Sequence, residues 1–253
     1  MIAVIGDIHG CLKSLDALIN NVFRKYDISK FIVLGDFVDR GKNSLGVTKF
    51  LMRLSQEYRV TLLRGNHEDM LIDYVRGQNR YPNYSWHERI GLSAITSFSD
   101  GKINDMFDMS RSDIYCYFAP YMPFFESSII YTEEVVGSTK FFFSHAGIER
   151  NGIPIEEQYR YCTPSEVAIY HPFIWGRQIV KFENQFFDYT VVHGHIPLFN
   201  KKGGNKKPSI RKDKKGSIIS VNLDTGCVYG GALTAMLIDH TGQYEFESVK
   251  CMD

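Results

Sequence analysis

The sequence predicts an α/β protein, with a parallel sheet from the first half of the chain packed against a second, mixed or antiparallel sheet from the second half. Two observations carry this prediction. Short apolar runs alternate with helical periodicity over residues 2–63, whereas apolar runs follow one another without helices over residues 217–249. A length of 253 residues is ordinary for one such domain, and no repeat or linker divides the chain. We therefore expect a single domain over residues 1–253.

The first half shows the alternation most clearly. Apolar residues predict a strand at 2–5, a helix at 12–26, a strand at 31–34, a helix at 45–54 and a strand at 60–63. Strands joined through helices pair in parallel with right-handed crossovers. The carboxyl ends of these three strands should therefore meet at one edge of a sheet.

The middle of the chain, residues 69–139, lacks obvious strands and is rich in aromatic residues. We interpret it as a helical insertion whose aromatic side chains pack into the core, with an aromatic wall for a ligand as the alternative.

The second half changes character. Apolar runs predict strands at 140–143, 189–192, 217–223, 233–238 and 244–249. We expect these strands to form the second sheet.

The predicted strands end beside polar side chains that can bind metal ions. These residues are Asp7, His9, Asp36, Asn66, His145 and His195. Six oxygen and nitrogen ligands exceed what one ion draws from a protein when positions must stay open for substrate. They suit two borderline divalent ions that share a carboxylate, and Asp36, after the central strand, is the natural bridge. Two such ions serve attack of a metal-bound hydroxide on a phosphoryl centre.

Composition identifies no partner, because 29 Lys and Arg balance 29 Asp and Glu. Five cysteines, at 11, 116, 162, 227 and 251, are widely spaced and form no C-x-x-C pair. This spacing argues against a disulfide framework and against a cysteine-based zinc site, and it favours a reducing compartment. The sequence starts directly with a strand and contains no apolar run of membrane-spanning length, so we expect a cytoplasmic protein without a membrane partner.

One segment departs from this balance. Within a predicted loop at 200–216, eight cationic residues accompany a single acid, Asp213. The segment from Lys201 to Lys215 is interpreted as a solvated extension, with a patch that binds nucleic acid or attracts an anionic substrate as the alternative.

Several motifs occur in a fixed order along the chain. They are GDIHG at 6–10, GDFVDRG at 35–41, GNHE at 65–68, SHAG at 144–147, IWGR at 174–177, GH at 194–195 and DTGCVYGG at 224–231. Together they resemble the phosphoprotein phosphatase family of calcineurin-like metallophosphoesterases, and IWGR and DTGCVYGG look like its small bacterial and phage members.

The resemblance implies two mixed β-sheets packed as a sandwich flanked by helices, with a dinuclear centre of Mn, or of Fe or Zn, at one edge. It assigns the first ion to Asp7, His9 and Asp36, and the second to Asp36, Asn66, His145 and His195. His193 competes with His195, but the family places its ligand in the Gly-His pair.

The resemblance also implies catalytic roles. His67 would be the general acid, Asp39 would orient it, and Arg40 and Arg177 would clamp the phosphate together with Asn66. Arginine forks match phosphate oxygens well, and a His paired with Asp suits proton transfer near neutral pH. Arg64 and Glu68 are expected to support the structure.

The implied enzyme is a metal-dependent phosphomonoesterase, a protein serine/threonine phosphatase that would act on a phosphoprotein or phosphopeptide and also on phosphotyrosine. The alternative is a symmetrical dinucleoside tetraphosphate hydrolase, whose second motif usually lacks the residue matching Asp39 and whose third usually reads GNHD rather than ending in Glu68. An RNA-end phosphatase and a non-catalytic scaffold remain further alternatives. The physiological substrate, the metal and the oligomeric state stay open at this point.

Overall fold

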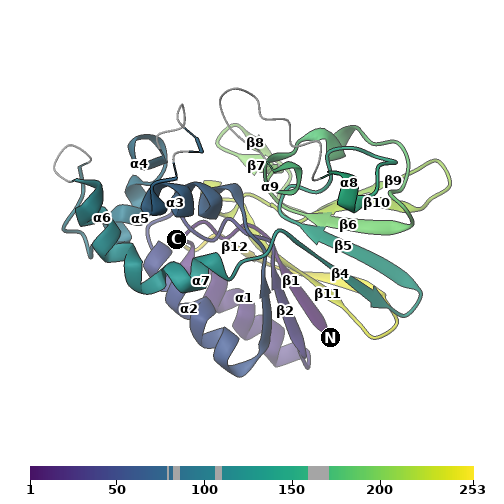
Figure 1. Ribbon diagram of the computed structural model, residues 1–253. Coiled ribbons are helices and arrows are strands. Elements are labelled where there is room, and N and C mark those ends of the chain that lie inside the picture. Colours follow the sequence, from purple (N-terminus) through teal and green to yellow (C-terminus); the bar gives the residue numbers. More distant parts are fainter. Residues whose placement is uncertain (79, 82–85, 106–109, 159–170) are drawn as a thin grey trace.

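Two five-stranded sheets lie face to face, with helices along the outer side of the first (Figure 1). The computed structural model describes residues 1–78, 80–81, 86–105, 110–158 and 171–253. The strand order is β12-β11-β1-β2-β3 in the first sheet and β4-β5-β6-β10-β9 in the second. Both sheets contain parallel and antiparallel pairs. The predicted fold class, an α/β sandwich of two mixed sheets flanked by helices, is confirmed.

The first sheet begins as the sequence predicts. Its parallel strands are β1 (Ile2–Ile5), β2 (Lys30–Val33) and β3 (Arg59–Leu62), connected by α1 (Leu12–Lys25) and α2 (Ser44–Glu57). The amphipathic face of each helix explains its place, because Leu15 and Leu18 of α1 are buried against the sheet.

The last two strands, β11 (Ala232–Ile238) and β12 (Tyr244–Lys250), complete this same sheet. β11 runs antiparallel to β1, with Ile2 opposite Ile238, and β12 pairs with β11. The prediction that residues 233–249 belong to the second sheet is therefore wrong. All seven residues of β11 are buried, and an apolar pattern reports burial without reporting which sheet supplies it.

The second sheet has a parallel centre of β5, β6 and β10, with β4 and β9 as antiparallel edges. The strands are β4 (Tyr131–Val136), β5 (Thr139–Ser144), β6 (Tyr189–His193), β9 (Ser209–Lys212) and β10 (Ile218–Asn222). Short elements beside it are α8 (Ile155–Gln158), α9 (Pro172–Trp175) and the 3-10 turn Gln178–Lys181, whereas the 3-10 turn Cys227–Tyr229 contacts β11 of the first sheet.

Alternation along β5 shows how the sheets pack. Phe141 and Phe143 belong to the core between the sheets, together with Val4 and Ile32 of the first sheet. Phe142 lies in a separate cluster on the outer face of the second sheet. The two-residue period of a strand thus divides three consecutive phenylalanines between two cores.

The aromatic-rich region is helical over most of its described length. Its helices are α3 (Asn66–Arg76), α4 (Trp86–Arg89), α5 (Leu92–Phe98), α6 (Arg111–Phe118) and α7 (Met122–Glu126), with a 3-10 turn at Ala119–Tyr121. Trp86, Phe118 and Phe125 are buried in the core on the helical side of the first sheet. The prediction of a helical insertion over 69–139 is wrong at β4, which is a strand. Two consecutive glutamates in this segment interrupt the apolar pattern from which a strand would be predicted.

The basic segment is also more ordered than predicted. Phe199–Asn200 (β7) and Gly203–Gly204 (β8) form a small hairpin, and Ser209–Lys212 is the edge strand β9 rather than loop. Arg211 donates to the main-chain oxygens of Ile179 and Phe182, so its charge is engaged within the fold.

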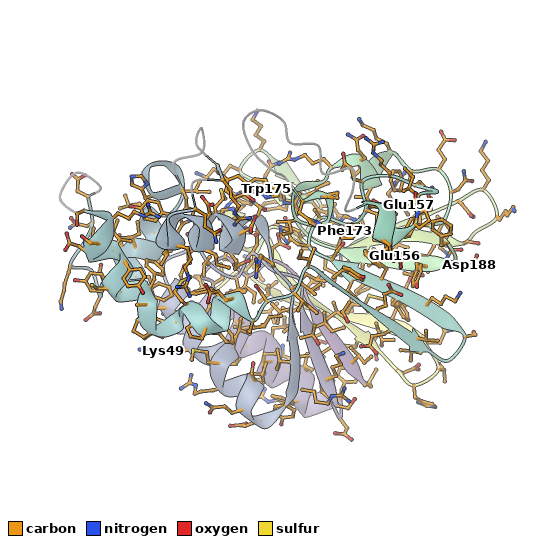
Figure 2. All side chains as sticks on the ribbon, viewed as in Figure 1. Lys49, Glu156, Glu157, Phe173, Trp175 and Asp188 are labelled. Carbon is orange, nitrogen blue, oxygen red and sulfur yellow. The ribbon has the colours of Figure 1, made fainter. Side chains whose placement is uncertain are left out.

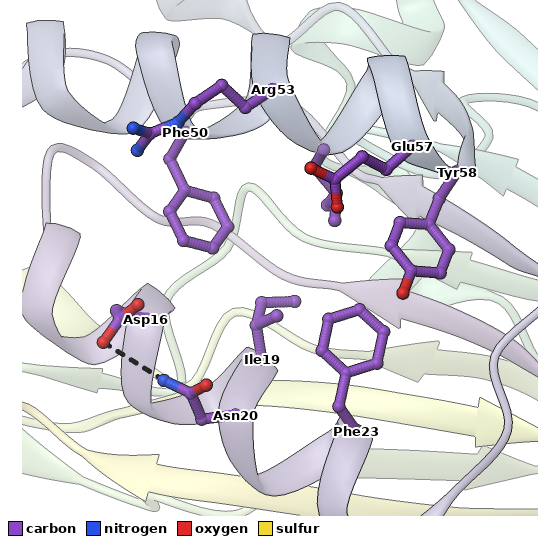
Figure 3. Close-up of a pocket in the computed structure, with 9 residues that line it drawn as sticks. Asp16, Ile19, Asn20, Phe23, Phe50, Arg53, Glu57 and Tyr58 are labelled. Carbon is purple, nitrogen blue, oxygen red and sulfur yellow. Dashed lines mark hydrogen bonds between the residues drawn. The ribbon is translucent and has the colours of Figure 1, made fainter.

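A groove of about 260 Å³ opens between α1 and α2 (Figure 3). Ile19 and Phe23 of α1 face Phe50 and Tyr58 across it. None of the predicted site residues lines this groove. Among the described residues, no helix combines the length and apolar character needed to cross a membrane.

Candidate dinuclear metal centre

Loops from both sheets bring the predicted ligands to one edge of the sandwich. Asp7, Asp36 and Asn66 follow β1, β2 and β3 of the first sheet, and His145 and His195 follow β5 and β6 of the second. The carboxyl ends of parallel strands face a common crevice, as in other α/β folds. All six predicted ligands, His9 included, are at most 9% exposed.

The first group of ligand atoms surrounds one oxygen of Asp36. His9 Nε2 lies 3.4 Å and His67 Nε2 3.9 Å from Asp36 Oδ2. The other ring nitrogen of His9 lies 2.9 Å from the main-chain oxygen of Val38, to which it donates. The candidate acid His67 therefore stands at the edge of the first group.

The second group surrounds the other oxygen of Asp36. His145 Nε2 lies 3.3 Å from Asp36 Oδ1 and 3.1 Å from Asn66 Oδ1. His195 Nδ1 lies 2.9 Å from the same Asn66 oxygen and 3.2 Å from His145 Nε2. Asp36 thus presents one oxygen to each group, which is the arrangement expected of a bridging ligand.

Asp7 belongs to neither tight group. Its two carboxylate oxygens accept the main-chain N–H of His195 at 3.3 and 3.0 Å. Gly194 makes this approach feasible, because a Cβ there would overlap Asp7 Oδ1. The sequence pairs Asp7 with His9, whereas the structure places its carboxylate against the loop that carries His195.

The donor set fits cations. Main-chain oxygens of Val38 and Leu34 accept from Nδ1 of His9 and His145, so in the neutral rings the Nε2 lone pairs face Asp36. Lone pairs directed at a carboxylate repel it unless a proton or a cation lies between them. Although burial opposes it, the charge of Asp36 raises the pKa of His145 to about 10, so a proton takes that place in the metal-free protein.

The pKa values of the buried carboxylates also indicate that the site favours bound positive charge. Burial, reinforced by Asp224, raises the pKa of Asp7 well above its usual range, and burial raises the pKa of Asp224 to about 6. Burial also lowers the pKa of His195 to about 2, which keeps its ring in the neutral, metal-binding form. Carboxylate, amide and imidazole donors suit Mn, Fe or Zn, and the set does not choose among them.

His67 and Asp39 form a buried pair beside the first group. Their Nδ1 and Oδ2 atoms are 2.7 Å apart, and Trp86 Nε1 donates to the same carboxylate oxygen at 2.7 Å. Arg40 donates from Nε and a terminal nitrogen to His67 Nε2 at 3.3 and 3.1 Å. Burial, with the charge of Arg40, lowers the pKa of His67 to about 4, and burial raises that of Asp39. A dianionic ligand between Arg40 and His67 would favour a proton on Nε2.

The two arginines predicted to clamp phosphate are both exposed. The guanidinium of Arg40 lies over the ring of Tyr229, 5.5 Å from its centroid. Arg177 follows α9, and its charge contributes to the lowered pKa of His195, which places it within electrostatic reach of the second group. Figure 2 labels Phe173 and Trp175 on this short helix, which in that view lies between α3 and the second sheet.

Glu68 and Arg64, which the sequence predicts to support the structure, both hold neighbouring segments through hydrogen bonds. Glu68 is fully buried and accepts the main-chain N–H groups of Asp36, Phe37, Val38 and Gly65, which fixes the bridging loop. Arg64 donates to main-chain and side-chain oxygens around Ser128. His193 Nδ1 lies 3.0 Å from the Gly194 oxygen and joins neither ligand group, whereas His195 lies in the second group.

Backbone strain concentrates at the site. Of the eight non-glycine residues with positive φ among those described, five are His9, Asp36, Asp39, Arg40 and His195. Such conformations are costly for side chains of this size and persist where the surrounding structure holds them. Their clustering marks this edge as the functional region independently of any motif.

Three residues at the site escaped the sequence analysis. Trp86 appeared only as one core aromatic, although a buried indole N–H needs an acceptor, and here that acceptor is Asp39. Asp224 and Tyr229 belong to DTGCVYGG, a segment without a predicted chemical role. Asp224 lies 5% exposed, close enough to raise the pKa of Asp7.

Fold and site together define a metal-dependent phosphoesterase. A model of the calcineurin-like phosphoesterase family matches residues 1–220, so the chain belongs to that family. This family uses a dinuclear metal centre, and the two groups around Asp36 are able to hold it.

Several relatives that match almost the whole chain share one name. A bis(5′-nucleosyl)-tetraphosphatase PrpE (asymmetrical) of Oceanobacillus iheyensis is 25% identical, over 92% of this chain and 87% of the relative. The protein of the same name from Bacillus subtilis is 24% identical, over 91% and 88%. These names specify asymmetrical cleavage of the dinucleoside tetraphosphate. The alternative that the sequence suggested was a hydrolase that cleaves it symmetrically.

A solved structure of a protein serine/threonine phosphatase from Saccharomyces cerevisiae, with similarity to human phosphatase PP5, shares the fold. Its TM-score is 0.55 at 15% identity, covering 100% of this chain and 80% of that one.

Proposed function

We propose that the protein is a phosphomonoesterase that removes phosphate from serine and threonine residues of proteins. The observation that supports this substrate class is the pair of His67 and Asp39, with His67 Nδ1 held 2.7 Å from Asp39 Oδ2 and Nε2 directed toward Arg40. This geometry places a ring nitrogen beside the position where a phosphate would bind, and a dianionic phosphate between Arg40 and His67 would favour the proton that this nitrogen has to donate.

The leaving group explains why such a pair matters. Serine leaves a phosphoester as an alkoxide, a strong base that needs a proton as the P–O bond breaks. When a dinucleoside polyphosphate is hydrolysed, the nucleotide leaves as a phosphate anion. This anion is a much weaker base than the serine alkoxide. A buried acid with its own orienting carboxylate is therefore most useful for alcohol leaving groups.

The other side chains have complementary roles. Arg40 and Arg177 would bind the phosphate oxygens, and the amide of Asn66 would contact both phosphate and ion. The two ions, when bound by the groups around Asp36, would supply a nucleophile at neutral pH and neutralise phosphoryl charge. His67 Nε2 would deliver its proton to the departing oxygen, while Asp39 holds Nδ1 and stabilises the charged ring.

A second candidate is the asymmetrical hydrolysis of dinucleoside tetraphosphates. The names of relatives that match about nine-tenths of the chain support it. The same metal centre would accept a phosphoanhydride, with less dependence on His67.

The two candidates separate in one experiment. Wild type and His67→Asn, loaded with Mn²⁺, are assayed on a phosphoserine peptide, a phosphotyrosine peptide, diadenosine tetraphosphate and a 3′-phosphorylated oligonucleotide. We expect the phosphoserine peptide to be the best substrate and its kcat to fall about 10²- to 10⁴-fold in the variant, with a much smaller loss on the tetraphosphate. The exposed His240→Asn serves as the matched control.

Two results would overturn the proposal. A wild-type kcat/KM for the tetraphosphate far above that for every phosphopeptide would establish the second candidate. Equal losses on both leaving groups, with metal content maintained, would remove His67 from its role as acid.

A further inference from the structure

Three cysteines remote in sequence meet at the start of α1. Cys11 is the residue before the helix, Cys227 opens a 3-10 turn, and Cys251 follows β12. Their sulfur atoms all lie within 4.8 Å of one another. The inference from spacing that the chain has no cysteine-based metal site is thereby put in question, because folding closes separations of more than two hundred residues.

The separation suits three ligands of one ion. With metal–sulfur bonds of about 2.3 Å, the sulfur atoms around a tetrahedral or trigonal ion lie roughly 3.8 to 4.0 Å apart. Three sulfurs already within 4.8 Å reach that geometry through small side-chain rotations. Cys11 and Cys227 are each 1% exposed, whereas Cys251 is partly exposed and offers a route of entry.

A negatively charged side chain lies near the three sulfurs. Cys11 is the residue before the 14-residue helix α1. The carboxylate of Asp253 accepts the N–H groups of Lys13 and Ser14 in the same region and adds negative potential for an incoming ion.

We propose that Cys11, Cys227 and Cys251 form a metal site of their own, distinct from the site around Asp36, that binds a thiophilic d¹⁰ cation, Zn²⁺ or Cu⁺. Thiolates select such ions over the hard ions that oxygen ligands prefer. The bound ion joins the C-terminal segment to the loop that directly follows His9. The C-terminus, marked in Figure 1, lies beside the start of α1 through the bonds of Asp253.

Cadmium tests this site without interference from the catalytic centre. Cd²⁺ bound to thiolates gives an ultraviolet charge-transfer absorption, and the oxygen and nitrogen ligands around Asp36 give none. The full-length protein, kept reduced, is titrated with Cd²⁺ as wild type, Cys227→Ser, Cys251→Ser and the control Cys116→Ser. Cys116 is exposed and outside the cluster.

We expect wild type and the Cys116 variant to develop the band of one thiolate-bound Cd²⁺ per chain, in addition to any spectroscopically silent Cd²⁺ held around Asp36. Cys227→Ser and Cys251→Ser should lose at least about a third of the absorption per ion and bind at least about tenfold more weakly. Competition with Zn²⁺ and with Cu⁺ then shows which ion displaces cadmium more effectively.

Absence of the band in wild type, or equal bands in all four proteins, would reduce the cluster to apolar packing of three thiols and overturn the proposal. Loss of the band in the Cys116 variant would overturn it as well. If the buried Cys227 variant fails to fold, as judged by circular dichroism, the partly exposed Cys251 variant decides the question.

Discussion

Replacing Trp86 by Phe should weaken catalysis without touching a metal ligand. The indole N–H donates at 2.7 Å to Asp39 Oδ2, the same oxygen that His67 Nδ1 contacts at 2.7 Å. Trp86 is 2% exposed, so Phe preserves most of the packing and water does not replace the lost donor. In the Trp86→Phe variant, His67 is the one remaining hydrogen-bond partner of Asp39 Oδ2 among those described.

The magnitude follows from the charge of the acceptor. A hydrogen bond to a charged group contributes about 1.5–3 kcal/mol. Burial already raises the pKa of Asp39, and the Trp86 bond opposes that shift. Without it, Asp39 is more often neutral and stabilises the protonated ring of His67 less. If the whole bond energy is expressed in the transition state, kcat on a phosphoserine peptide falls by a factor of about 10 to 150.

The assay compares leaving groups. We expect Trp86→Phe to lower kcat on the phosphoserine peptide with little change in KM, and to affect p-nitrophenyl phosphate, whose leaving group needs no proton, far less. Phe118→Leu is the matched control, because the Phe118 ring packs against Trp86 at 5.9 Å and is fully buried but makes no bond to Asp39. Unchanged turnover in the Trp86 variant, or an equal loss in the Phe118 variant, would refute the reasoning.

Three further changes test other parts of the structure. Asp36→Asn replaces one of two bridging oxygens by an amide nitrogen, so elemental analysis should find at most about one ion per chain; two tightly held ions would contradict the bridge. Gly194→Ala places a methyl group on Asp7 and should reduce metal content while circular dichroism stays unchanged, whereas normal metal content would show that Asp7 can move freely. Asp253→Ala removes the carboxylate that caps α1 and should lower the free energy of unfolding in urea by about 1 kcal/mol, compared with the exposed Met252→Ala; equal stabilities would mean that the C-terminus is not docked there.

The clustering of the candidate ligands could be predicted because these residues share a simple rule of position. Asp36, Asn66 and His145 each follow an apolar strand, and the carboxyl ends of parallel strands meet at one edge of a sheet. Local sequence therefore contained the reason why these side chains meet, and their role as metal ligands stays a prediction. The sheet membership of β11 was not predictable in this way, since a buried apolar strand does not specify its neighbour.

Other features were hidden by competing signals. β4 carries Glu133 and Glu134, which pair with Tyr189 and Lys30, and these two consecutive charges interrupt the apolar pattern from which an edge strand would be predicted. Trp86 was indistinguishable from aromatic residues that only pack, because the need of its N–H for Asp39 depends on a contact across 47 residues. Hydrogen-bond partners of buried polar groups are fixed by tertiary structure, and single-sequence patterns do not report them.

The position of the catalytic edge has a consequence for stability. Asp36 and Asn66 come from the first sheet, and His145 and His195 from the second, so ions held among them would add a connection between two layers that already share an apolar core. An ion that binds only the folded protein adds stability that grows with its concentration, by about 2.7 kcal/mol at a hundred times its dissociation constant. In the metal-free protein the proton on His145 offsets part of the same charge. Metal binding at His145 and release of that proton are therefore linked.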